Sequence, residues 1–379
     1  MQHAEVTTLP SQKFHPRVYG VGAWTDNLPF AYDLVALIKP RVLVELGVDR
    51  GESYFAFCQS AAENATGTRC FGVDSWTGDE HVGGYDETTF REVSEHNAQH
   101  YSTLSTLLRC RFDEALPQFA PESIDLLHID GRHTESAARH DIDNWLPKLA
   151  PGGILLMHDV CVRTRGFGVW KVWDELRACS RAFTFDNGPG LGVWQKPPER
   201  TLPPMLEMLL SGSPADLVDY YAEKSREVRQ QITDDWRTGA VRHNAIGNQT
   251  IVQVFHTTPF SEENSVLARI GHNEWHTLRF PLPVNAGPMW LRIDFVSPFT
   301  RIDIKAVSVS ANAAEFFRAN SPAEFDRIRI AGDCEREPGS DYLRLKITGI
   351  DPQLYLPELR VHSSDVTVSL MLRVSPQTV

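Results

Sequence analysis

The chain has 379 residues, and at about 150 residues per domain this length predicts two or three compact units. Hydrophobic residues make up 42% and charged residues 23%, which is ordinary for a globular protein and excludes a largely disordered, collagenous or coiled-coil chain. Lys and Arg number 37 against 49 Asp and Glu, and the resulting charge of −12 disfavours nucleic acid and anionic membrane surfaces as partners.

The N-terminal residues lack the basic start and apolar run of a secretion signal. No stretch approaches the roughly 20 apolar residues of a membrane-spanning helix, so we expect a cytoplasmic protein without a transmembrane segment. The six cysteines form no C-x-x-C pair, and neither disulfides nor a zinc cluster is expected.

Residues 41–196 alternate short β-rich runs with helical stretches, which is typical of a parallel sheet covered by helices on both faces. Helices are expected in the stretches 52–64, 134–149 and 169–181. The expected strands are 42–46, 70–74, 123–130, 153–159, 183–186 and 191–195. Their nearly continuous apolar runs are those of strands buried on both faces, so an open α/β domain is predicted.

Prolines at 197–204 end this pattern, and helical spacing follows. Pro214 and Asp216 fit the first turn of a helix whose apolar face packs on a domain or on a second copy of the chain. That face comprises Leu217, Tyr221, Val228, Ile232 and Trp236. Short alternating runs after residue 249 predict an antiparallel β-sandwich. The expected domains are 1–198, a helical linker 199–245, and a β-sandwich domain 246–379.

A glycine turn follows the first predicted strand, with Glu45, Gly47 and Gly51 in the pattern E-x-G-x-x-x-G. Glycines let a ligand approach the backbone, and the next helix offers unpaired N–H groups. Asp49 stands where a dinucleotide fingerprint needs its second glycine, which disfavours a nicotinamide oxidoreductase. Asp74, at the end of the second strand, suits the hydroxyls of a ribose.

Several segments in order, among them DSWTGDEHVGGYD (74–86), SIDLLHIDGRHT (123–134) and LLMHD (155–159), resemble one known group. They are similar to class I S-adenosylmethionine (SAM) methyltransferases of the macrocin O-methyltransferase-like group, which is associated with bacterial glycan genes. The resemblance covers about residues 40–196 and implies a Rossmann-like fold and SAM as cofactor. It does not extend to the C-terminal half.

Carried over by motif, the resemblance implies three groups of cofactor-binding residues. The methionine side is assigned to Glu45, Gly47, Gly51 and Ser53, the ribose to Asp74, and the adenosine region to Ser75, Trp76, Phe112 and Asp113. Trp76 is equally explained as a core residue, because a tryptophan after a strand commonly packs inside.

The reactive end is expected at Asp130 and His133, directly after the strand 123–130. Ligands of open α/β sheets bind beyond the carboxyl ends of the strands. An imidazole with a pKa of about 6.5 suits removal of a hydroxyl proton, so His133 is the candidate general base. The alternative is a capping or surface histidine.

His158 and Asp159 end the next strand, and with Asp130 they form the candidate metal site. Two carboxylates suit Mg²⁺, which would orient substrate oxygens. Related sugar O-methyltransferases place two adjacent acids here, so the histidine favours a softer divalent cation or no metal. Without a metal, the aspartates would orient His133 or bind sugar hydroxyls.

The leading hypothesis is a SAM-dependent O-methyltransferase acting on a sugar hydroxyl of a glycan, glycolipid precursor or glycosylated small molecule. The alternative is a non-catalytic glycan-binding or assembly protein with a methyltransferase-like domain. In the C-terminal half, Trp275, Trp290 and Tyr342 either stack on sugar rings or fill the core. Homo-oligomerisation is left open.

Overall fold

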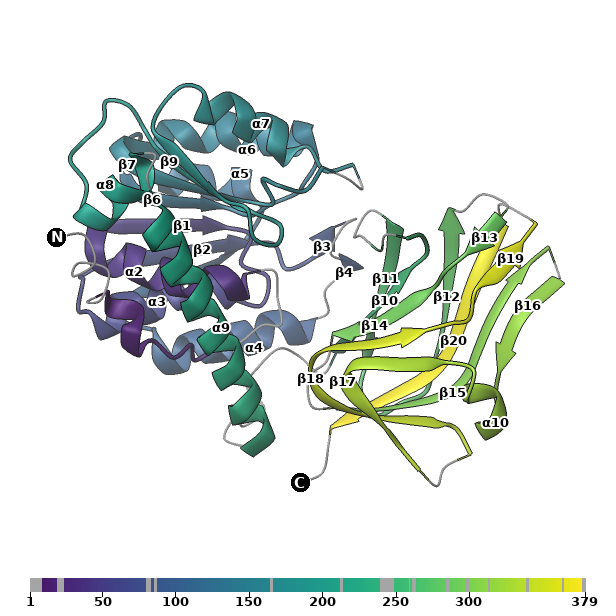
Figure 1. Ribbon diagram of the computed structural model, residues 1–379. Coiled ribbons are helices and arrows are strands. Elements are labelled where there is room, and N and C mark those ends of the chain that lie inside the picture. Colours follow the sequence, from purple (N-terminus) through teal and green to yellow (C-terminus); the bar gives the residue numbers. More distant parts are fainter. Residues whose placement is uncertain are drawn as a thin grey trace. The chain divides into compact units, whose positions relative to one another are not determined.

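The structure is a computed structural model that describes most of the chain. The described residues are 9–18, 24–79, 83–84, 87–163, 166–211, 214–238, 249–258, 260, 264–283, 287–296, 300–312, 314–338, 341–362 and 365–376. Residue contacts divide the chain into two compact units, Met1–Ile232 with His243–Gly247, and Thr233–Arg242 with Asn248–Val379 (Figure 1). Among the described helices, none is both long and apolar enough to cross a membrane.

The first unit is built on a seven-stranded sheet with the order β5-β2-β1-β6-β7-β9-β8. The strands are β1 (Val42–Leu46), β2 (Arg69–Asp74), β5 (Ser105–Arg109), β6 (Ile124–Ile129), β7 (Leu149–His158), β8 (Ala182–Phe185) and β9 (Leu191–Gln195). The pairs among β5, β2, β1, β6 and β7 are parallel, while β9 runs antiparallel to both β7 and β8. This arrangement confirms the expected Rossmann-like methyltransferase fold. Strand β5 was not predicted.

Helices cover both faces of this sheet (Figure 1). On one face lie α2 (Leu28–Ile38), α3 (Glu52–Glu63) and α4 (Glu87–His100), and on the other lie α5 (Phe112–Ala115), α6 (Glu135–Trp145) and α7 (Val169–Arg177). The buried side chains of α6 and α7, such as Trp145 and Trp173, join those of the strands in one hydrophobic core. A two-residue pair, β3 (Gly78–Asp79) with β4 (Gly83–Gly84), follows β2.

Helices α8 (Pro204–Leu210) and α9 (Ala215–Thr238) follow the sheet. Of the expected apolar face of α9, Leu217, Tyr221 and Val228 are buried. The side chains of Ile232 and Trp236 lie outside the described residues. Tyr221 donates a hydrogen bond to Asp33 of α2 at 3.0 Å, so α9 is tied to the first unit.

The second unit is a nine-stranded antiparallel sheet, which confirms the expected antiparallel β domain. Its strands are β10 (Gln249–Phe255), β11 (Ser265–Gly271), β12 (His276–Pro283), β14 (Arg292–Val296), β15 (Thr300–Ala311), β16 (Ala314–Ala319), β17 (Arg329–Glu337), β18 (Leu343–Tyr355) and β20 (Asp365–Pro376). A separate pair joins β13 (Gly287–Met289) to β19 (Leu359–Val361), and α10 spans Pro322–Phe325.

The long strand β18 changes its partner along its length. Its first part pairs with β15, where Leu345 faces Ile302, and its last part pairs with β14, where Leu354 faces Ile293. These four side chains are fully buried in one apolar core. A single hydrogen-bonded sheet therefore bends around its own core and supplies both layers of the sandwich.

Asp33 is fully buried at the contact of α2 with α9 and the N-terminal segment. Its carboxyl accepts hydrogen bonds from the backbone N–H and the hydroxyl of Ser11, both at 2.6 Å, and from Tyr221. Burial raises the pKa of Asp33 from 3.8 to about 6, although these donors pull it down. The buried charge therefore costs stability at neutral pH.

The first prediction concerns Asp33→Asn, which keeps the shape of the side chain and removes its charge. Because the folded-state pKa is raised to about 6, the contribution of Asp33 to stability is complete below pH 4 and is lost as the pH rises through 6. The free energy of unfolding of the variant, relative to wild type, should therefore increase by up to about 3 kcal/mol between pH 4 and pH 7. Denaturant unfolding at several pH values measures this, with the exposed Asp216→Asn as control. A difference that does not change with pH would contradict it.

Candidate active site

The candidate site lies where neighbouring parallel strands of the first unit end. Strands β2, β1, β6 and β7 are adjacent, and their carboxyl ends bear Asp74, the glycine turn, Asp130 and His158–Asp159. The N–H of Gly47 donates to the carbonyl of Val73 at 2.9 Å, and that of Asp130 donates to Leu46 at 2.8 Å. The backbone itself therefore brings the turn and Asp130 together at the edge where open α/β sheets bind ligands.

The turn needs glycine at two positions. Gly47 has φ +90°, and a Cβ there would lie 1.9 Å from the carbonyl oxygen of Asp130. Gly51 has φ +85°, and a Cβ there would lie 2.4 Å from the ring of Phe55. Both positions thus combine a left-handed backbone with close approach of other atoms. Helix α3 begins at the next residue, Glu52.

Asp74 holds the turn in place from the end of β2. One carboxylate oxygen accepts hydrogen bonds from the backbone N–H of Val48 at 3.0 Å and of Asp49 at 2.9 Å. The other accepts one from Trp76 N–H at 2.7 Å. Burial raises the pKa of Asp74, and the three amides oppose this rise. A carboxylate has about four acceptor positions, so one remains for a ligand hydroxyl.

Glu45 lies beneath the turn and is fully buried. It accepts a hydrogen bond from the hydroxyl of Ser53, and His128 Nδ1 lies 3.4 Å from the same oxygen. Burial raises the pKa of Glu45, while His128 and Ser53 lower it. The predicted pair Glu45 and Ser53 is thus brought together, as an internal support of the first turn of α3.

Trp76 is also a support of the turn. It is 2% exposed, and its indole N–H donates to the carbonyl of Asp49 at 2.8 Å. Its ring packs on Phe90 of α4 at 4.8 Å. Ser75 is half-buried and lies within hydrogen-bond distance of Thr77. Parts of the 74–86 segment, namely 80–82 and 85–86, lie outside the described residues.

The predicted cofactor residues Phe112 and Asp113 have different surroundings. A Cβ on Gly131 would lie 2.6 Å from the Phe112 ring, so this half-buried ring lines the segment between Asp130 and His133. Asp113 is exposed and pairs with His140 Nε2 at 2.9 Å. That carboxylate raises the pKa of His140.

Two histidines and two aspartates form an imidazole–carboxylate network, which comprises Asp130, His133, His158 and Asp159. His133 Nε2 lies 3.0 Å from an oxygen of Asp159. His158 Nδ1 lies 3.4 Å from Asp130 and 3.3 Å from Asp159. The His133 ring stacks on Phe167 at 4.4 Å and an angle of 16°. The expected reactive residues of two strands therefore form one connected cluster.

The charges in this network stabilise each other. Burial alone lowers the pKa of His158, but the carboxylates of Asp130 and Asp159 raise it well above its ordinary value. Burial alone would raise the pKa of Asp130 and that of Asp159. The neighbouring imidazoles outweigh burial, so both pKa values are lowered. The two carboxylates thus favour the protonated, cationic form of His158.

The sequence analysis missed Trp24, which covers the network. Its indole N–H donates to Asp130 at 3.1 Å, and its ring stacks on His158 at 5.4 Å and 24°. It also meets the ring of His128 edge-on at 4.7 Å. Trp24 is 4% exposed. No motif surrounds Trp24, so the only available signal was a tryptophan shortly before the first predicted strand.

The group with metal-ligand spacing differs from the expected set. Asp130, His133 and Asp159 each offer one ligand atom, and these atoms lie within 4.8 Å of one another. His133 thus takes the place expected for His158. One imidazole and two carboxylates suit a transition metal better than Mg²⁺, which prefers oxygen ligands.

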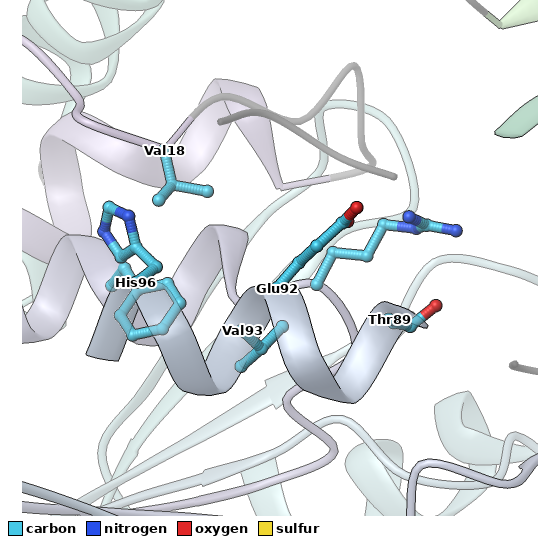
Figure 2. A pocket seen from close by; sticks show the side chains of 7 residues that line it. Val18, Thr89, Glu92, Val93 and His96 are labelled. Carbon is cyan, nitrogen blue, oxygen red and sulfur yellow. The ribbon is translucent and has the colours of Figure 1, made fainter. Parts of the chain in front are cut away.

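A small hollow lies near the turn, between α3, α4 and the N-terminal segment (Figure 2). It is lined by Val18, Arg50, Phe55, Thr89, Glu92, Val93 and His96. In Figure 2, Val18 and His96 lie at one end, and Thr89 and Glu92 extend from α4 toward the other. Burial lowers the pKa of His96 to about 4, so this ring is neutral at physiological pH. The hollow contains no residue of the network.

Comparison with known proteins bears on this region. Residues 44–160 match a family model described as a methyltransferase domain. The uncharacterized protein y4gI of Sinorhizobium fredii is 40% identical over 232 residues, which are 60% of this chain and 25% of that protein. The chain thus spans about a quarter of the length of this curated relative. The matched residues 44–160 include the turn, Asp74 and the whole network.

Solved structures with partial similarity include two methyltransferases. Methyltransferase PaMTH1 of Podospora anserina, bound to S-adenosylhomocysteine, has 14% identity and a TM-score of 0.36, over 52% of this chain and 96% of that chain. The O-methyltransferase TomG of Streptomyces achromogenes, in complex with SAM, has 13% identity and a TM-score of 0.36, over 51% of this chain and 88% of that chain.

The second prediction concerns the turn. Gly47→Ala should lower the free energy of unfolding by more than about 3 kcal/mol, because its Cβ would collide with the Asp130 carbonyl at a left-handed backbone position. Gly67→Ala is the matched control. Gly67 also has positive φ, +74°, but nothing lies within 4 Å of its Cβ, so about 1 kcal/mol is expected. Denaturant unfolding measures both variants, and equal losses would show that the close approach to Asp130 is unimportant.

Proposed function

We propose that this protein is a SAM-dependent O-methyltransferase that acts on a sugar hydroxyl of a glycan, glycolipid precursor or glycosylated small molecule. The match of residues 44–160 to a methyltransferase domain supports the reaction class. The observation that carries the proposal is the close approach of Gly47 to the backbone of Asp130, where an added Cβ would lie 1.9 Å from the carbonyl oxygen. It joins the cofactor turn to the network that would receive the acceptor. The sugar acceptor rests on the sequence resemblance.

SAM would lie across the turn at Gly47 and Gly51, with its ribose at Asp74. One free acceptor position on Asp74 allows one direct bond to a ribose hydroxyl. Glu45, Ser53 and Trp76 would act indirectly, by holding the turn and the start of α3 in place. Phe112, half-buried beside Gly131, offers a flat apolar surface to the adenine, with Ser75 and Asp113 at its polar edge. SAM carries no phosphate, which agrees with Asp49 in the turn.

His133 would act as the general base. In the transfer, the acceptor oxygen bonds to the methyl carbon as the carbon–sulfur bond breaks, and S-adenosylhomocysteine leaves. The hydroxyl proton passes to His133. Asp159 at 3.0 Å accepts the N–H of Nε2, which fixes the tautomer with its lone pair on Nδ1. The stacked Phe167 covers one face of this imidazole, while the lone pair of Nδ1 points outward in the plane of the ring.

Asp130 would hold the acceptor. Its carboxylate lies beside the turn, and Trp24 fixes one oxygen by a hydrogen bond. The remaining acceptor positions suit sugar hydroxyls, which are hydrogen-bond donors. His158 would keep Asp130 and Asp159 ionised by its own charge. Because positioning alone supplies much of the rate in a bimolecular transfer, this fixed arrangement is itself catalytic.

His133 cannot serve both as a ligand of a divalent cation and as the general base. A metal held by Asp130, His133 and Asp159 would occupy the imidazole that must take the proton. Such a cation would instead lower the pKa of a bound hydroxyl. A protonated His158 would offset one of the two carboxylate charges and weaken their attraction for a cation, so we propose the base at His133 rather than the metal.

The third prediction tests the function. The wild-type protein should bind S-adenosylhomocysteine in calorimetry and transfer methyl groups from SAM to at least one member of a panel of sugar acceptors. His133→Ala should lower turnover at least about 100-fold, with an unchanged affinity for S-adenosylhomocysteine, because none of the cofactor contacts proposed above involves the His133 side chain.

The exposed His362 of the second unit supplies the control, since His362→Ala should keep full turnover. A protein that does not bind S-adenosylhomocysteine would refute the assignment. Binding without transfer to any acceptor would instead favour the non-catalytic glycan-binding alternative, and a His133→Ala variant with normal turnover would remove the base.

The fourth prediction separates the two roles of His133. Dialysis against a chelator should leave the turnover unchanged, because the proposed reaction uses His133 as a base and not as a metal ligand. Turnover is measured before and after chelation and after addition of Mg²⁺ or Mn²⁺. Loss of activity that Mn²⁺ restores would assign His133 to the metal and not to the proton.

A further inference from the structure

The second unit exposes two large aromatic side chains in very different surroundings. Among the described residues, Trp275 is 36% exposed and Trp290 is 38% exposed. The Trp275 ring has Arg373 at 5.0 Å, Lys305 at 5.8 Å and Tyr342 edge-on at 5.6 Å and 80°. No such ring or cation contact within the described part of the chain involves Trp290. Only Trp275 therefore belongs to an organised cluster.

Strand register places this cluster on the outer face of the sheet. Asp303 of β15 pairs with Arg344 of β18 on one side and with Arg373 of β20 on the other. Paired residues of neighbouring strands project to the same face. The adjacent Ile302 and Ile304 are fully buried on the opposite, inner face. The cationic side chains thus stand in a row across three strands.

Asp303 fixes this row. It is 1% exposed although it lies on the outer face, because the two arginines cover it. Arg344 Nε donates to one carboxylate oxygen at 2.7 Å, and Arg373 Nη2 donates to the other at 2.7 Å. Arg344 also donates to the hydroxyl of Tyr342 at 2.8 Å. Charged hydrogen bonds of this kind hold guanidinium groups in a set orientation.

The cluster has a positive charge on a chain whose net charge is −12. Lys305, Arg344 and Arg373 carry three positive charges against the single negative charge of Asp303. Lys305 is exposed and forms no ion pair within the described residues. One carboxylate thus orients two cations and leaves an excess of two charges beside an exposed indole. This arrangement suits an anionic ligand that also has an apolar face.

We propose that Trp275, Lys305, Tyr342, Arg344 and Arg373, here called the Trp275 surface, bind an acidic polysaccharide built of uronate residues. A pyranose ring has a flat face of C–H groups that packs on an indole, and its carboxylate pairs with guanidinium and ammonium groups. Tyr342, perpendicular to Trp275, bounds the stacking position. The extended row across β20, β15 and β18 suits a chain of sugars.

This inference does not rest on methyl transfer. The surface lies entirely within the second unit, and its residues include none of the network or the glycine turn. Failure of the proposed transferase activity would leave the binding test intact. Success in both would identify a chain-binding surface in a protein that modifies sugar hydroxyls.

The test uses the full-length protein and polygalacturonate as the probe, with neutral dextran and dextran sulfate for comparison. Affinity electrophoresis or calorimetry should show binding to polygalacturonate and none to dextran. Trp275→Ala should weaken this binding about tenfold, because it removes the stacking surface. Lys305→Gln should also weaken it, and since Lys305 is exposed this change does not disturb the core.

Trp290→Ala is the matched control, because it removes an equally exposed indole from the same unit and should leave the affinity unchanged. Circular dichroism confirms that each variant is folded. The proposal is overturned if wild type does not bind polygalacturonate, or binds dextran as tightly. It is also overturned if Trp275→Ala and Trp290→Ala behave alike, or if binding to dextran sulfate is equally strong and insensitive to Trp275, since simple charge attraction then suffices.

Discussion

The candidate site depends on one electrostatic constraint. The carboxylates of Asp130 and Asp159 lie close together at the ends of the adjacent strands β6 and β7. Two carboxylates whose oxygens lie within 4.8 Å of each other repel each other unless a cation lies close to both. His158 lies 3.4 Å from one and 3.3 Å from the other, and the two carboxylates favour its cationic form. Trp24 stacks on the ring of His158. The position of Asp159 in turn orients His133, because Asp159 accepts the N–H of the His133 imidazole.

The glycine turn is likewise held by a few side chains. Asp74 accepts three backbone N–H groups, Trp76 donates to the turn from its outer side, and Glu45 with Ser53 anchors α3 from below. These contacts need no ligand, so the turn is already formed before a cofactor arrives. A preformed site loses less conformational entropy on binding.

The sequence predicted much of the fold, because the buried parallel strands have apolar runs and the E-x-G-x-x-x-G motif marks the first turn. Strand β5 escaped prediction since it is an edge strand in which only Ser105 is buried and the other residues are half-buried or exposed. The site residues on strand ends could be named in advance for the same topological reason. Trp24 could not, because it contacts Asp130 across 106 positions of sequence and lies in no motif. The ionisation of His158 likewise depends on distances that no spacing rule supplies.

The change of partner along β18 has a consequence for how the second unit comes apart. A sandwich of two separate sheets can lose one layer while the other persists. Here β18 bonds to β15 in one layer and β14 in the other, and β17 accompanies it along both parts. Peeling either layer away must break the hydrogen bonds of this shared strand, so we expect the unit to unfold in one cooperative transition and a nick within 343–355 to destabilise both layers at once.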